Sequence, residues 1–156
     1  MNAVLGDNVI THDFAVDIDR PELLPDGVYS LVLVDSWKGL MYGRVPKLML
    51  TFRIIDEGQY YGKQLIRCYN LKGFTKRKEI KPSGWHSNLV KEYSILFGRP
   101  NNLKQIGVRA FKSKVIKGRT RAVTKDAKQN PLHPNLHYSV IDALLSVEAG
   151  DGYSGA

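Results

Sequence analysis

Apolar and polar residues alternate along the stretch KLMLTFRIID, residues 47–56. Successive side chains of a strand point to opposite faces of its sheet, so this alternation predicts a half-buried strand. Its opposite face carries the basic residues Lys47 and Arg53. The four apolar residues of the expected core face are Leu48, Leu50, Phe52 and Ile54.

Four more strands are predicted from β-branched and aromatic residues that are bounded by turn residues. Only the segment KPSGWHSNLVKEYSILFGRP has the apolar spacing of an amphipathic helix. Ser83 is its predicted N-cap, and Gly98 with Pro100 ends it. The additional strands are expected at residues 27–37, 63–71, about 108–117 before a turn near Gly118, and 137–147.

The resulting order is three strands, one helix and two strands. This is the order of the OB-fold, a mainly β architecture in which a five-stranded barrel carries one helix between strands three and four. A split β-sandwich and an SH3-like barrel have similar strand counts, but the position of the helix favours the OB-fold. We expect an acidic N-terminal arm (1–26), an OB-fold domain (27–147) and a flexible tail (148–156).

The bulk composition is that of a globular protein, with 43% hydrophobic and 24% charged residues among 156. No apolar run approaches the ~20 residues that cross a bilayer, and the N-terminus lacks the cationic start and long apolar core of a signal peptide. Cys68 is the only cysteine, so no internal disulfide can form. We therefore expect a cytoplasmic location and no membrane partner.

The distribution of charge is more informative than its total of +8. Residues 37–128 contain 22 Lys and Arg against five Asp and Glu, a net charge of +17. Residues 1–36 have a net charge of −6, and residues 129–156 one of −3 with no Lys or Arg. A solvated basic surface is one explanation of the central block, but an anionic polymer as partner explains it better.

Three stretches resemble the small OB-fold single-stranded-DNA-binding proteins of bacteriophages and mobile elements. They are LPDGVYSLVLVDSW, LMLTFRIIDEGQYYGKQL and the helix ending ILFG, and the resemblance covers roughly residues 24–147. It implies a non-catalytic protein that binds single-stranded DNA in replication or recombination. The strongly acidic C-terminal tip of that family is reduced here to Glu148 and Asp151 among glycines.

Single-strand binders combine a cationic groove with aromatic rings on which bases stack, at about 1–3 kcal/mol per base. In an OB-fold the ligand crosses strands two and three, between the loops that join strands one–two and four–five. We expect Trp37 and Tyr42, in the first loop, to be the stacking platforms, and core packing is the alternative for Trp37 and Phe74. The nucleic-acid-binding candidates are Trp37, Lys38, Tyr42 and Arg44 in the first loop; Lys47, Arg53, Arg67 and Tyr69 on the outer face of strands two and three; Lys72, Phe74, Lys76, Arg77 and Lys78 after strand three; and Lys117, Arg119, Arg121 and Lys125 in the loop after strand four.

Patterns of catalytic or metal-binding residues are weak. The two histidines of HPNLH (133–137) have the spacing of metal ligands on a helix, but Pro134 argues against a regular helix there. Asp13, Asp17 and Asp19 resemble ligands of a hard cation, although a solvated acidic arm explains them more simply. No phosphate-binding loop or nucleophile elbow occurs. We therefore predict no enzyme activity, no metal and no cofactor.

The sequence thus predicts a sequence-tolerant, single-stranded DNA-binding protein from a phage or mobile element. Two alternatives stay open. One is a double-stranded nucleic-acid-binding accessory protein, which would use the charge without the aromatics; the other is a small phage-type effector that binds a host protein. Binding to RNA, homo-oligomerisation and recruitment of replication or recombination proteins through the acidic termini also stay open.

Overall fold

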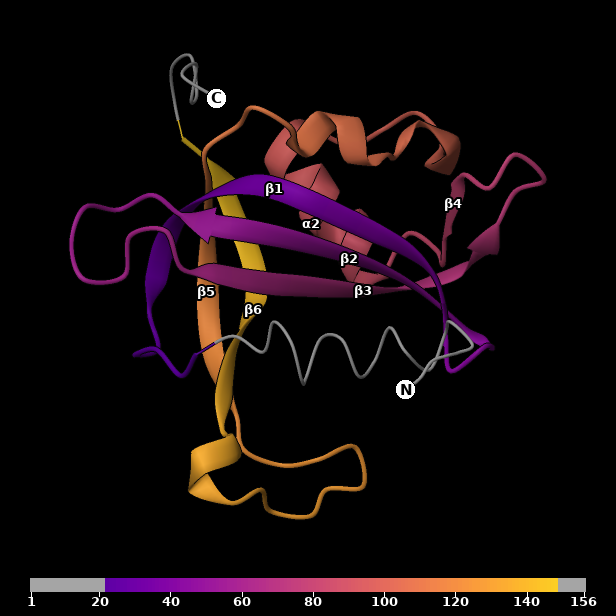
Figure 1. Ribbon diagram of the computed structural model, residues 1–156. Coiled ribbons are helices and arrows are strands. Elements are labelled where there is room, and N and C mark those ends of the chain that lie inside the picture. The colour runs from indigo at the N-terminus through magenta and orange to yellow at the C-terminus, as the bar shows by residue number, and fades with distance from the viewer. Residues whose placement is uncertain (1–21, 149–156) are drawn as a thin grey trace. The chain divides into compact units, whose positions relative to one another are not determined.

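The computed structural model describes residues 22–148, which form one sheet of six strands and one α-helix (Figure 1). Most of the predicted acidic arm and tail therefore lies outside the described residues. Hydrogen-bonded neighbours follow the order β4-β3-β2-β1-β5-β6. The bounds are β1 Val28–Met41, β2 Val45–Ile54, β3 Gln64–Phe74, β4 Ile80–Pro82, α2 Asn88–Phe97, β5 Ile116–Val123 and β6 Tyr138–Val147, with short 3-10 helices at Leu103–Gln105, Val108–Phe111 and Pro134–Leu136.

The prediction of a mainly β fold with one helix is confirmed in this part of the chain. The sheet has six strands rather than five, and β4 and β6 stand at its two ends, so the predicted barrel is not closed. The added strand is β4, three residues long, which pairs antiparallel with β3. Within residues 22–148, no helix combines the length and the apolar character that a membrane span requires.

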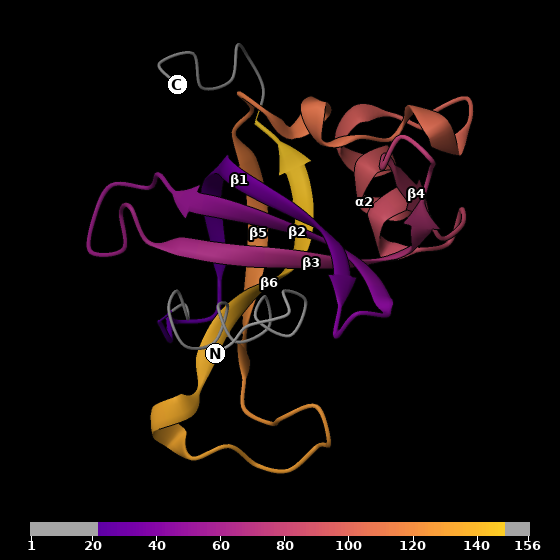
Figure 2. The ribbon, with the colours of Figure 1, turned by 45° about the vertical axis from the view of Figure 1, so that its right-hand side comes forward.

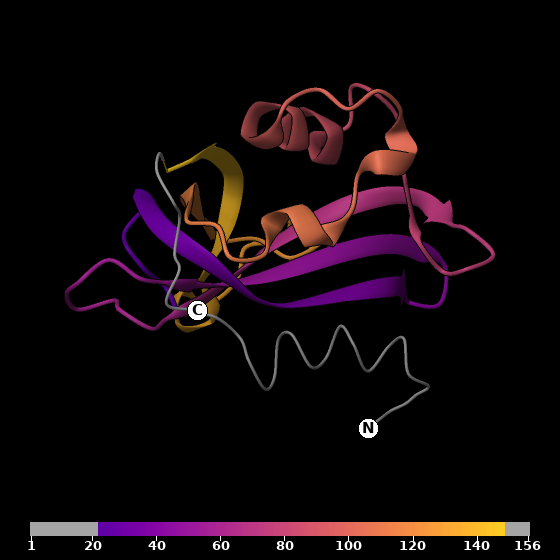
Figure 3. The same ribbon diagram turned by 90° about the horizontal axis from the view of Figure 1, so that it is seen from above.

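The described chain divides into two compact units. Unit 1 contains residues 36–50 and 68–110, and unit 2 contains residues 22–35, 51–67 and 111–148. In unit 1, α2 lies beside the strands, as the view from above shows (Figure 3). In unit 2, β5 and β6 run antiparallel side by side, and the chain between them forms a long loop beyond their ends (Figure 2).

The predicted burial of β2 is confirmed along its whole length. Its four apolar residues are fully buried, whereas Lys47, Met49, Thr51 and Arg53 between them are only half-buried. β2 contributes to both units, so this single alternating strand supplies apolar side chains to the two cores. The buried residues are Leu48 and Leu50 in unit 1, and Phe52 and Ile54 in unit 2.

Three predicted boundaries are wrong. β1 does not end at Trp37 but continues to Met41, so the expected loop shrinks to a tight turn. The helix begins after Ser87 rather than Ser83, although it ends at Gly98 as predicted. The predicted strand at 108–117 is largely a 3-10 helix and connecting chain, and the real strand, β5, follows it.

Gly118 explains why β5 was misplaced. It lies inside β5, opposite Tyr29 of β1 and Leu144 of β6, and not in a turn. A Cβ atom at this position would lie 2.6 Å from Leu31 Cδ1 and 3.4 Å from Ile141 Cγ2. Glycine is therefore required here, because neighbouring core side chains already occupy the space that a side chain at position 118 would need.

We predict that Gly118→Ala lowers the free energy of unfolding by about 1–3 kcal/mol, the usual cost of overpacking a core. Urea denaturation followed by circular dichroism measures the change. Gly84→Ala is the matched control, because a Cβ there meets no atom within 4 Å. Equal stability of the two variants would contradict the packing account of Gly118.

Candidate nucleic-acid interface

Unit 1 contains a groove of about 770 Å³ beside the β3–β4 hairpin. One side is formed by residues of this hairpin, and another by the segment 103–108, which follows α2. Ile80, Pro82 and Ile106 give the groove an apolar part. Its basic side chains are Lys38, Lys72, Lys76, Arg77, Lys81 and Lys104.

The charge of this groove is almost entirely positive. Glu79 is the one acidic residue in its lining, against six basic residues. Within residues 22–148, none of these six basic side chains forms an ion pair; the ion pairs there involve other Lys and Arg residues. The groove therefore has a positive potential that the described part of the protein does not neutralise, and it can attract an anion.

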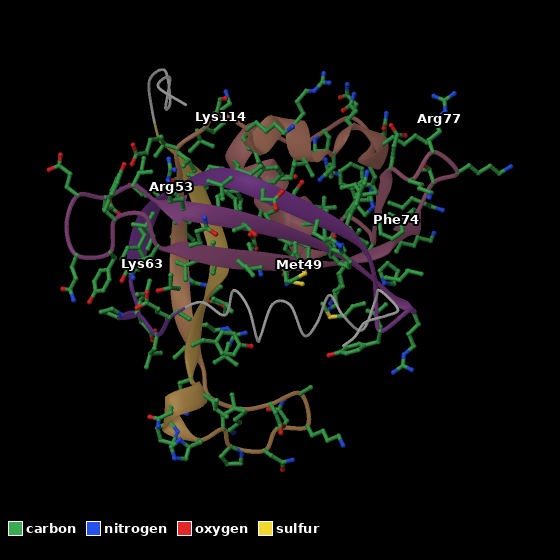
Figure 4. All side chains as sticks on the ribbon, in the orientation of Figure 1. Met49, Arg53, Lys63, Phe74, Arg77 and Lys114 are labelled. Carbon is green, nitrogen blue, oxygen red and sulfur yellow. The ribbon has the colours of Figure 1, made fainter. Side chains whose placement is uncertain are left out.

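The β3–β4 hairpin holds several of these cations in place. The hairpin turn is closed by the Thr75 and Lys78 amides, which donate to Glu79 O at 2.9 Å and to Thr75 O at 2.8 Å. The register shifts between Leu71 and Gly73, so Lys72 is the extra residue of a β-bulge. Arg77 projects from the tip of this hairpin (Figure 4).

The structure brings together four of the predicted residues in this groove: Lys38, Lys72, Lys76 and Arg77. Lys81 and Lys104 were missed, although the basic central block contains both. Phe74 is half-buried and lies directly opposite Ile80, a groove residue, in the β3–β4 pairing. The other candidates of unit 1 do not line the groove; they are Trp37, Tyr42, Arg44, Lys47, Tyr69 and Lys78.

Trp37 lies within β1 rather than in a loop, and it is half-buried. Its ring covers the backbone of Gly39, because a Cβ atom there would lie 2.8 Å from Trp37 Cζ2. Trp37 and Lys38 are consecutive strand residues, so they project to opposite faces. Trp37 therefore does not share a surface with the cationic groove. Tyr42, exposed and at φ 57°, forms the tight turn with Gly43 at φ 75°.

The face assignment of β3 is wrong. Tyr69 and Arg67 were expected outside, but only 1% and 8% of their surfaces are exposed, whereas Ile66 and Cys68 are half-buried. The Tyr69 hydroxyl donates a 2.6 Å hydrogen bond to Glu92 Oε1 on α2. Since Glu92 is also buried, it offers the polar partner that lets this ring enter the core. Neither Arg67 nor Tyr69 is available to a ligand.

The remaining candidates belong to unit 2, and most of them are on a strand rather than in the predicted loop. Lys117, Arg119 and Arg121 lie within β5, and only Lys125 lies beyond it. Lys117 pairs with Glu148, and Arg119 and Arg121 pair with Asp142. Arg53, on β2, is half-buried, and its Nε atom has no hydrogen-bond partner within residues 22–148.

Glu148 is fixed at the end of β6 by two donors. The Ser30 hydroxyl donates at 2.9 Å, and Lys117 Nζ lies 3.1 Å from the same carboxylate oxygen. The Ser30 hydrogen bond, followed by Lys117, lowers the pKa of Glu148 below its ordinary value. Lys117 is thus engaged by a carboxylate, in contrast with the cations of the groove.

No family model, curated protein or solved structure matches this chain. Within the described residues, no group of three or more His, Cys, Asp or Glu side chains is placed to hold a metal ion. The two histidines of the HPNLH stretch flank a short 3-10 helix, where the His133 ring accepts a hydrogen bond from the Asn135 amide at 3.1 Å.

We predict that Tyr69→Phe lowers the free energy of unfolding by about 1–3 kcal/mol, because it removes a hydrogen bond to a buried carboxylate. Oligonucleotide affinity should not change, since the ring is inside the core. Tyr61→Phe is the control, because Tyr61 is largely exposed and its stability should change by less than about 0.5 kcal/mol. A loss of affinity in Tyr69→Phe without loss of stability would restore Tyr69 as a binding residue.

Proposed function

We propose that this chain is a non-catalytic protein that binds single-stranded DNA with little sequence preference. The observation that carries the proposal is the groove of unit 1, where six basic side chains face one acidic side chain and have no ion-pair partner in the described residues. A polyanion would release the condensed counterions of its phosphates on contact with such a groove. The resemblance of the sequence to OB-fold single-strand binders of phages and mobile elements supports the same conclusion.

The volume and lining of the groove are compatible with a nucleic-acid strand. Its volume of about 770 Å³ and the six basic side chains of its lining suit a polymer whose phosphates contact Lys and Arg. The apolar residues Ile80, Pro82 and Ile106 offer contact to sugars or bases without any hydrogen-bonding code. Such a lining supports sequence tolerance.

Double-stranded nucleic acid is the second candidate ligand, and one observation favours it. The lining of the groove includes no aromatic side chain, so the groove alone does not provide stacking platforms. Stacking would depend on Phe74 beside the groove or on Trp37 elsewhere in unit 1. Titration of fluorescent single-stranded DNA, duplex DNA and RNA of equal length separates these ligands, and a clear preference for duplex would reject the main proposal.

The groove is tested with the triple variant Lys72→Gln, Lys76→Gln and Arg77→Gln. Each lost phosphate contact should reduce the slope of log K against log salt by about 0.7, so three contacts reduce it by about 2. Fluorescence anisotropy with oligothymidylate at several salt concentrations measures both affinity and slope. We expect weaker binding to all sequences alike, because phosphate contacts do not read bases.

The matched control removes three exposed lysines that do not line the groove: Lys91, Lys112 and Lys114, each changed to Gln (Lys114 is labelled in Figure 4). The net charge falls by the same amount in both variants. If the two variants lose affinity equally, the protein binds through its total charge, and the groove has no special role.

Trp37 projects to the face of β1 opposite Lys38 of the groove, so it tests whether the bound strand also passes over that second face. Trp37→Ala should weaken binding of single-stranded DNA by about 1–3 kcal/mol, because a ring held over Gly39 has an exposed part on which a base can stack. In a Trp85→Phe background, bound oligonucleotide should quench the fluorescence of Trp37. A loss of stability of about 3–5 kcal/mol without quenching would show that Trp37 is a core residue.

A further inference from the structure

Two exposed arginines of β5 share one carboxylate of β6. Arg119 Nε and Nη2 donate to Asp142 Oδ2 at 3.1 and 2.9 Å, and Arg121 Nε lies 3.3 Å from Asp142 Oδ1. The two arginines are two residues apart on a strand, so they lie on the same face. Their side chains are 53% and 56% exposed, and that of Asp142 is 34% exposed.

A β-bulge places Asp142 at this position. Arg119 pairs with Ala143 and Thr120 with Ile141, so Asp142 is the extra residue on β6 and has no partner on β5. Bulges re-aim side chains and are common next to functional sites. Here the bulged residue contacts both neighbouring arginines with one carboxylate.

The stability of the fold gives only a weak reason for this arrangement. Exposed ion pairs contribute little to stability, since solvent screens them and the side chains lose conformational freedom. One carboxylate between two guanidinium groups also leaves a net positive charge. Each guanidinium has five N–H donors, and Arg119 uses two of them on Asp142, so both arginines retain donors for another acceptor.

A hollow of about 330 Å³ adjoins this cluster. It is lined by Arg121 and by the residues that follow β5, including Thr124, Lys125 and Gln129. Lys125 adds a second positive charge, and Thr124 and Gln129 add hydrogen-bond donors. A phosphate diester matches this chemistry, because its two free oxygens fit the fork of a guanidinium group.

We propose that Arg119 and Arg121 form a phosphate clamp in unit 2, which Asp142 holds in position, and that this clamp takes a phosphodiester of a nucleic-acid backbone. The inference rests on the proposed function and adds a second site to it. Asp142 is a positioning residue: it fixes the two guanidinium groups and does not contact the phosphate. Without it, both arginine side chains would have to be ordered on binding.

The direction in which Asp142→Asn changes the affinity for DNA distinguishes a positioning role of Asp142 from simple neutralisation of the arginine charges. Asp142→Asn removes a negative charge beside the clamp, so electrostatics alone would strengthen the binding of DNA. If Asp142 positions the arginines, the affinity for oligothymidylate should instead fall, because ordering two long side chains costs roughly a factor of 5 to 150. Unchanged or tighter binding would overturn the clamp.

Glu57→Gln is the matched control, since Glu57 is an exposed acidic residue of unit 2 without an ion pair among the described residues. This substitution also removes one negative charge, and the affinity of the variant for oligothymidylate should stay equal or rise. Arg119→Lys is the second variant, which keeps the charge and loses the fork, and it should weaken binding as Asp142→Asn does. If Arg119→Lys binds like the wild type, the clamp is wrong even if Asp142→Asn is unstable. Thermal unfolding of each variant detects such instability.

The same titration separates this inference from the proposed function. If the wild-type chain binds oligothymidylate and the Asp142→Asn and Arg119→Lys variants bind it equally well, the clamp fails and the proposed function stands. If the wild-type chain binds no nucleic acid even at low salt, both fail.

Discussion

The buried row of β2 is the constraint on which both units depend. Leu48 and Leu50 in unit 1, and Phe52 and Ile54 in unit 2, are withdrawn from water, and each such side chain contributes about 1.5–3 kcal/mol to folding. A slip of one residue in the pairing of this strand would expose all four and bury its basic face. The register of β2 is therefore fixed, and its basic residues must remain on the other face.

Uninterrupted alternation made β2 predictable from the sequence, and a run of β-branched and aromatic residues did the same for β6. The faces of β3, in contrast, depend on a residue distant in the chain. The sequence predicted Arg67 and Tyr69 on the outer face of this strand. The structure reverses this because Glu92, on α2, accepts the hydrogen bond of the Tyr69 hydroxyl inside the core. The turn predicted near Gly118 was wrong for a related reason. The sequence alone does not distinguish a glycine that is required by packing against Leu31 from a glycine that is required by a turn.

The candidate site was predictable only where its residues are neighbours in the chain. Lys72, Lys76 and Arg77 fall in one short basic stretch, and the structure places them along one groove. Lys104 also lines the groove, although it follows α2 in the sequence. Its position depends on the tertiary structure, which a local sequence pattern does not predict. The contact of Asp142 with both arginines was not predicted because it comes from a bulge, and a bulge depends on the register between two strands rather than on the sequence of one.

The basic residues of the unit 2 clamp are paired with a carboxylate, whereas those of the unit 1 groove are not, and this difference bears on the ligand. In unit 2, Lys63, Lys117 and the two arginines of the clamp pair with carboxylates, whereas the six cations of the unit 1 groove have no such pair in residues 22–148. Repulsion among exposed charges is moderated by salt over a Debye length of about 8 Å, so an unpaired cluster costs the free protein little. A polyanion, in contrast, gains the release of its condensed counterions when it meets that cluster. The unpaired positive charges of the groove therefore support the proposal that its ligand is a phosphate polymer, because no carboxylate of the described residues has to be displaced from them.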